Sequence, residues 1–105
     1  MTKDAIPEQP SLLETGVRVP QHVVYRSFPS ETVVLNLQTG KYHGLNPTAG
    51  EMLAMLEKAE CVRDAAAVAA QHYEQPQAKT EQDMCDLCGA LLDRDLIEID
   101  GSGAR

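Results

Sequence analysis

The feature that constrains the fold most is a series of three short segments with strand patterns, joined by tight turns. β-Branched and aromatic residues over His22–Phe28 favour a first strand. Residues 28–31 (Phe-Pro-Ser-Glu) predict a tight turn, because proline pre-sets φ there. A second strand is expected over Glu31–Leu37, a hairpin loop over Gln38–Gly40 with the glycine at positive φ, and a third strand over Lys41–Leu45. Three strands joined in this way form an antiparallel meander.

The second and third strands each carry a further expectation. Alternation along the second strand places Val33, Leu35 and Leu37 on one face and Thr32, Val34 and Asn36 on the other. A helix start follows the third strand directly, so nothing in the pattern covers the free side of this strand. A short edge strand that carries a lysine, here Lys41, still accepts a pairing partner.

Three helical segments follow the strands. Asn46-Pro47 is a cap followed by proline at the first helical position, and it opens a helix that runs to about Lys58. The alanine-rich segment Cys61–Tyr73 predicts a second helix, which the stretch around Pro76 ends.

The third helix is expected to run from Thr80 to Asp93 or Arg94. Thr80 with Asp83 three residues later resembles a capping box. The apolar stripe of this helix consists of Met84, Leu87, Cys88, Leu91 and Leu92. Leu96–Ile99 then forms a short extended tail with the sheet as a packing partner.

The fold class is therefore α+β: a three-stranded antiparallel β-meander followed by a three-helix bundle, the inventory of a winged helix-turn-helix. The chain of 105 residues has room for one domain. We expect residues 1–15 to be a flexible tail, 16–100 the domain and 101–105 a frayed end.

The charge distribution argues against nucleic acid as a partner. Residues 51–105 carry five basic and twelve acidic residues, whereas residues 1–50 are balanced. The third helix, which would read DNA in a winged helix, has Arg94 alone against a set of acidic residues at or near it: Glu81, Asp83, Asp86, Asp93 and Asp95. Groove binding needs positive charge to neutralise phosphates, so a basic or neutral partner fits better.

Signals for catalysis, metal binding and membrane insertion are weak. The chain has no glycine-rich phosphate loop and no nucleophile motif, so we expect no enzyme and no cofactor. Cys85 and Cys88 have the spacing of a zinc or redox half-site, but a second ligand pair is missing. The favoured interpretation is that both cysteines act as small hydrophobic residues in helix packing. No apolar run approaches a membrane span and no signal peptide opens the chain, which predicts a cytoplasmic protein with reduced thiols.

Residues 34–49, Val-Leu-Asn-Leu-x-Thr-Gly-Lys-Tyr-x-x-Leu-Asn-Pro-Thr-Ala, resemble the signature of the PqqD family. The resemblance extends through the helices to about Ile99, and the cysteines are not part of the family pattern. The family comprises RiPP recognition elements, small domains that hold the leader of a ribosomal precursor peptide during its modification. Within it, the chain looks most like the free-standing leader-binding subunit of split lasso-peptide proteases.

The resemblance implies non-catalytic capture of a leader by β-strand addition at strand 41–45, with a groove between this strand and helix 80–94. It implies a separate cysteine-protease subunit as partner and leaves room for a cyclase. The expected leader-binding residues are Lys41, Tyr42, His43, Gly44, Leu45, Asp83, Met84, Asp86, Leu87, Cys88 and Leu91. Those on the helix stripe are foremost core residues. Two alternatives stay open: a PqqD-type chaperone that presents its peptide to a radical SAM enzyme in PQQ biosynthesis, and a metal or thiol redox module built on Cys85 and Cys88.

Overall fold

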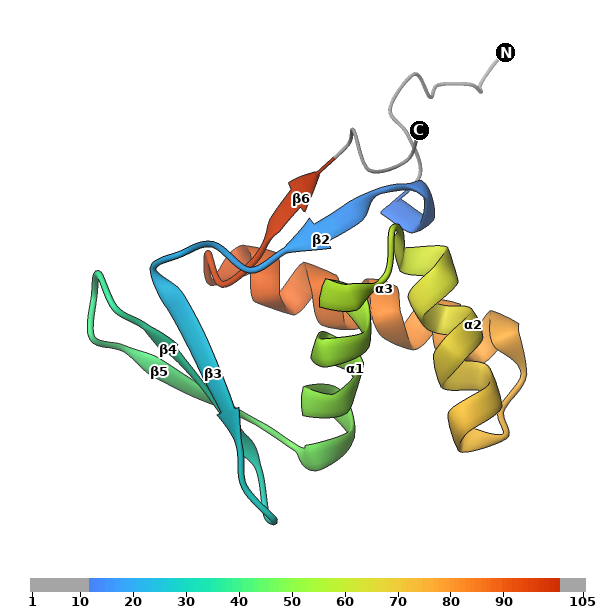
Figure 1. Ribbon diagram of the computed structural model, residues 1–105, viewed down its shortest axis with the longest axis horizontal. Helices are drawn as coiled ribbons and strands as arrows, with labels where there is room; N and C mark the ends of the chain where they lie inside the picture. The colour runs from blue at the N-terminus through green and yellow to red at the C-terminus, as the bar shows by residue number, and fades with distance from the viewer. Residues whose placement is uncertain (1–11, 101–105) are drawn as a thin grey trace.

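The computed structural model describes residues 12–100, which form an α+β domain with two small sheets and three helices. In chain order the elements are the 3-10 turn η1 (Leu12–Glu14), β2 (Gly16–Arg18), β3 (Val23–Ser27), β4 (Thr32–Asn36), β5 (Tyr42–Leu45), α1 (Pro47–Lys58), α2 (Val62–Tyr73), α3 (Gln77–Asp93) and β6 (Glu98–Asp100). The antiparallel meander β3-β4-β5 lies to one side of the helices, and β2 pairs with β6 (Figure 1). The predicted fold class is confirmed.

Both turns of the meander close as the sequence predicts. Phe28 and Glu31 exchange backbone hydrogen bonds: the Phe28 N–H donates at 2.7 Å and the Glu31 N–H at 3.3 Å. In the second turn Gly40 has φ +75°, a conformation that favours glycine. The Asn36 Oδ1 atom accepts hydrogen bonds from the N–H groups of Gln38 (2.9 Å) and Thr39 (3.2 Å). These local bonds position the hairpin that precedes β5.

Strand β4 buries its more polar face. The inward residues are Thr32, Val34 and Asn36, while Val33 and Leu35 are half-buried on the outer face. Helix α1 approaches this inner face so closely that a Cβ atom on Gly50 would lie 2.5 Å from the Thr32 Cβ. The Thr32 hydroxyl lies 3.0 Å from the Ser27 hydroxyl, so its polar atom has a partner although the residue is buried. Tyr25, also inward, donates its O–H to Glu57 of α1 at 2.6 Å.

Helices α1 and α2 form where the sequence predicts them. The Asn46 side chain caps α1 by accepting a hydrogen bond from the Ala49 N–H at 2.8 Å, and Pro47 is the first helical residue. Helix α2 begins after Cys61, which is its N-cap residue. It ends at Glu74, whose left-handed φ of 56° breaks the helix.

The predicted start of the third helix at Thr80 is wrong. Helix α3 begins three residues earlier, at Gln77, directly after Pro76. Thr80 is a buried interior residue, and its hydroxyl donates to the Ala66 carbonyl of α2 at 2.8 Å. The threonine therefore joins two helices instead of capping one.

The C-terminal extended segment is present, but it packs in a different place from the one expected. It does not join the meander: β6 pairs antiparallel with β2, and Val17 lies opposite Ile99. The sequence pattern did not indicate β2, because three residues are too few for a periodic signal. Leu96 and Ile97, which directly precede β6, are buried in the core.

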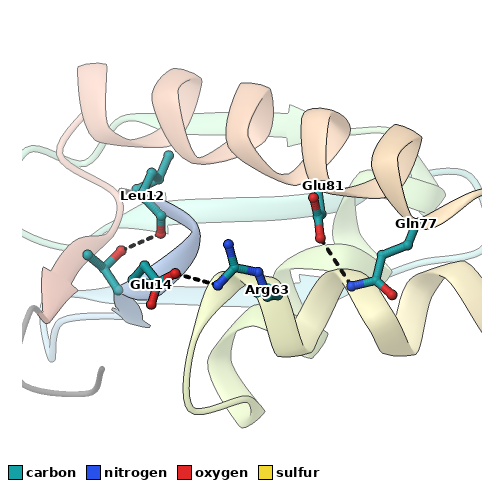
Figure 2. Close-up of polar contacts among 6 residues, drawn as sticks. Leu12, Glu14, Arg63, Gln77 and Glu81 are labelled. Atoms are coloured by element: carbon teal, nitrogen blue, oxygen red, sulfur yellow. Dashed lines mark hydrogen bonds and ion pairs between the residues drawn. The ribbon is translucent and has the colours of Figure 1, made fainter. Parts of the chain in front are cut away.

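The start of the described chain is held against the helices. Leu12–Glu14 form η1, and the Thr15 hydroxyl donates to the Leu12 carbonyl at 2.7 Å. Figure 2 shows Arg63 of α2 reaching Glu14 in an ion pair. Of the segment 1–15 expected to be a flexible tail, residues 12–15 are thus ordered; residues 1–11 and the expected frayed end, 101–105, lie outside the described part of the chain.

A single apolar core joins the inner face of the meander to all three helices. Its buried members are Val17, Val23, Val34, Met52, Leu53, Leu56, Val62, Ala65, Ala66, Ala69, Met84, Cys88, Leu91, Leu96 and Ile97. Three alanines of α2 are fully buried, which allows the close approach of α2 and α3. Within residues 12–100 no helix is long and apolar enough to cross a bilayer.

Candidate functional site

Strand β5 is an edge strand with one open side. Within residues 12–100 it pairs with β4 alone. The Asn36 N–H donates to the Lys41 carbonyl at 2.9 Å, and bonded pairs recur at every second residue of an antiparallel ladder. His43 and Leu45 therefore bond to β4. The N–H and C=O groups of Tyr42 and Gly44 point the other way, towards the open edge.

The side chains of β5 alternate between two faces of the sheet. His43 lies opposite Val34 and Leu45 opposite Thr32, so both are on the inner face, and both are half-buried. Tyr42 and Gly44 are on the outer face, where the Tyr42 side chain is 69% exposed. A strand added at this edge would project alternate side chains onto the same two faces.

A hollow of about 320 Å³ lies on the inner side, where the β4–β5 hairpin comes near the C-terminal end of α3. Its lining residues are Asn36, Thr39, Lys41, His43, Asp93, Arg94 and Asp95. Side chains of both charges line it, so it suits polar side chains of a bound segment better than large apolar ones. The structure thus brings Lys41 and His43 together with the end of α3.

The apolar residues of α3 expected at the site differ in how deeply they are buried. Met84, Cys88 and Leu91 are fully buried core residues and offer no surface to a partner in this conformation. Leu87 is half-buried against the same core.

The two expected carboxylates already have partners on α3 itself. Asp83 forms an ion pair with Lys79 at 2.8 Å, and Asp86 accepts a hydrogen bond from Gln82 at 2.9 Å. Both contacts join residues four apart on the exposed surface of the helix, where such pairs contribute little to stability. Either carboxylate can therefore exchange its partner at small cost.

Sequence reasoning missed the residues at the end of α3, Asp93, Arg94 and Asp95. The helix end was predicted near these positions, but their meeting with the β4–β5 hairpin is a tertiary contact with no local signal. The apolar outer face of the meander was missed as well. There Val24 and Phe28 are 46% and 48% exposed and line a shallow hollow of about 480 Å³ together with Val33 and Leu35.

The thiols of α3 lack the lowered pKa of a reactive redox site. Burial raises the pKa of Cys88 to about 12, with a further contribution from Cys85. Burial, followed by the charges of Asp86 and Glu81, also raises the pKa of Cys85. A reactive redox cysteine needs a lowered pKa, because the thiolate is the reacting form. Within the described residues, no cluster of three or more metal-ligating side chains occurs.

Comparison with known proteins places this geometry in a family. The family described as "Coenzyme PQQ synthesis protein D (PqqD)" matches residues 31–97. No curated protein sequence matches the chain at a significant level.

Two solved structures share the fold. One, described as "TbiB1 in Complex with the TbiA(beta) Leader Peptide", is 27% identical, with a TM-score of 0.69 over 77% of this chain and 94% of that one. The other, "Lasso peptide synthetase B1 complexed with the leader peptide", is 22% identical, with a TM-score of 0.69 over 78% and 96% of the two chains. Because the family match spans more than half of its residues, this chain belongs to the PqqD family.

Proposed function

We propose that the chain captures the leader segment of a ribosomally made precursor peptide, without catalysing a reaction itself, in lasso-peptide biosynthesis. The observation that carries this proposal is the open edge of β5, where Tyr42 and Gly44 direct their backbone groups outward beside the hollow at the end of α3. The 27% identical structure, described as a complex with a leader peptide, supports the same function.

The physical mechanism is strand addition. An extended peptide that runs antiparallel to β5 would exchange two hydrogen bonds with Tyr42 and two with Gly44, each worth about 1 kcal/mol. These bonds supply affinity with little regard to sequence. Specificity would come from the alternating side chains, which meet His43 and the hollow on one face and Tyr42 on the other.

Capture alone is useful because it raises the local concentration of the substrate. A peptide whose leader is held at β5 presents its remaining length to any enzyme that docks on the complex. We infer that this enzyme is a separate cysteine-protease subunit that removes the leader, with a cyclase as a further candidate. The proposal places this step in the cytoplasm, where the three thiols would stay reduced.

A second candidate function is a PqqD-type chaperone that presents its precursor to a radical SAM enzyme. The family match over residues 31–97 favours it, since that family is described by its part in PQQ synthesis. The same edge of β5 would hold the peptide, so the two candidates differ in the precursor that binds and not in the mechanism of capture.

The test is a proline substitution at the open edge. Gly44→Pro removes an N–H group that makes no bond to β4 and places the proline ring where the added strand must approach. We expect the affinity for a synthetic leader, taken from a precursor peptide encoded beside this chain, to fall at least about tenfold in calorimetry. Wild-type binding should be one-to-one and insensitive to chelator and reductant.

A control is Ser27→Pro on β3, the other edge of the meander, compared with Ser27→Ala because both changes remove the hydroxyl that contacts Thr32. The Ser27 N–H also points away from β4, because the neighbouring Phe28 is in a bonded pair with Glu31. This variant should bind the leader as the wild type does. Circular dichroism is measured on each variant to establish that it folds. Undiminished binding by a folded Gly44→Pro variant would show that the peptide does not add at β5.

A further inference from the structure

The carboxylate of Glu31 lies over the bare Cα atom of Gly44. A Cβ atom built on Gly44 would be 2.6 Å from the Glu31 Oε1 atom and 3.7 Å from its Cδ atom. Gly44 lies opposite Val33, so that Cβ would project from the outer face of the sheet. Glu31 immediately precedes β4, and alternation places it on this same face. The absence of a Cβ atom on Gly44 thus makes room for an acidic group at the open edge.

No cation occupies this position in the described part of the chain. Among residues 12–100, Glu31 takes part in no ion pair. Arg26 is on the same face, but it lies on β3, on the far side of Val33 from Gly44. Lys41 belongs to the hollow on the inner side, with His43. An exposed carboxylate that has no ion-pair partner within the described residues, at an edge that a peptide would join, is available to a charge on that peptide.

Strand addition would determine which peptide residue comes near Glu31. In the antiparallel arrangement, one peptide residue forms a bonded pair with Gly44, with the two Cα atoms about 5.5 Å apart. Its side chain projects from the outer face, above the glycine. The residues before and after it project to the inner face, and the residue two positions later pairs with Tyr42. Of these peptide residues, the one paired with Gly44 faces the Glu31 carboxylate.

We propose that Glu31 selects a lysine or arginine at the peptide position paired with Gly44. This inference rests on the proposed function and adds to it a specificity-determining residue and the chemistry of its ligand. Because Gly44 has no Cβ atom, the Glu31 carboxylate can lie at the open edge, and the aliphatic part of a long cationic side chain would run along the outer face beside it. Glu31 then accepts a charge-assisted hydrogen bond from its end.

Two peptide scans test the proposal. In the first, each residue of the synthetic leader is N-methylated in turn; the positions paired with Gly44 and Tyr42 should lose binding and should lie two residues apart. In the second, each residue is replaced by Lys or by Glu, and dissociation constants are measured for the wild type, Glu31→Gln and Glu31→Lys. The control variant is Glu60→Lys, which makes the same charge change at an exposed residue between α1 and α2.

We expect the Lys peptide to bind the wild type about threefold to tenfold more tightly than the Glu peptide, at the more N-terminal of the two N-methyl-sensitive positions. The preference should disappear in Glu31→Gln and reverse in Glu31→Lys, and Glu60→Lys should retain it. If the wild type binds the leader but no position shows this reversal, the role of Glu31 is refuted while the proposed function stands. If the wild type binds no leader at all, both are refuted.

Discussion

The close approach of α1 to the meander predicts that Gly50→Ala destabilises the domain. A Cβ atom on residue 50 would overlap the Thr32 hydroxyl and lie 2.5 Å from the Thr32 Cβ. Thr32 is 1% exposed and cannot turn outward, so α1 or β4 must move. Overpacking of a core costs about 1–3 kcal/mol, and this overlap belongs at the upper end. The better helix propensity of alanine offsets about 1 kcal/mol of this cost, so the free energy of unfolding should fall by about 2 kcal/mol.

Gly89→Ala is the matched control, because it makes the same change in α3. No atom lies within 4 Å of a Cβ built on Gly89, so only the gain in helix propensity of about 1 kcal/mol remains. The two variants should therefore shift the free energy of unfolding in opposite directions, as measured by urea denaturation followed by circular dichroism at 222 nm. If Gly50→Ala stabilised the protein as much as Gly89→Ala does, the close packing of α1 on β4 would be refuted.

The half-buried Tyr25 and the buried Cys88 and Thr80 each have a measurable effect. The pKa of Tyr25 is raised to about 12 by burial and by the hydrogen bond to Glu57, above its unfolded value of about 10. The contribution of Tyr25 to stability is therefore complete below pH 10 and is lost as the pH rises towards 12. Tyr25→Phe should reduce this alkaline loss of stability in urea titrations. An unchanged pH profile would contradict the raised pKa of Tyr25. The buried Cys88 thiol should react with a thiol reagent only on the timescale of unfolding, as mass spectrometry can follow, whereas rapid labelling in the native state would reopen the redox hypothesis. Thr80→Val removes the hydroxyl bonded to the Ala66 carbonyl and should cost about 1–3 kcal/mol in the same denaturation assay; a neutral result would contradict that bond's role.

The meander and the first two helices were predictable because their signals are local. The proline turn at Pro29, the glycine at position 40 and the Asn46 cap each depend on residues a few positions apart, and all three form as expected. Alternation also divided β4 correctly into two faces. It did not say which face is buried, because that depends on the distant Gly50, which makes room for Thr32.

The errors arise where tertiary contacts override local patterns. Thr80 matches the sequence pattern of a helix cap, yet its hydroxyl donates a hydrogen bond to the Ala66 carbonyl of α2. The apolar stripe of α3 was predicted foremost as core, and burial confirms this for Met84, Cys88 and Leu91, while its second role as one wall of a peptide groove stays a prediction. A further hollow lies at the end of that helix, where no periodic pattern marks Arg94.

Backbone amide exchange distinguishes an open β5 edge from an occupied one. With ¹⁵N-labelled protein, the N–H groups of Tyr42 and Gly44 should exchange with solvent in the free state and become strongly protected when the leader peptide binds. The N–H groups of Tyr25 and Ser27, which point to the open edge of β3, should exchange equally in both states. Protection of Tyr42 and Gly44 alone is the result this account predicts. Binding that leaves both unprotected, or protects the β3 edge instead, would contradict it.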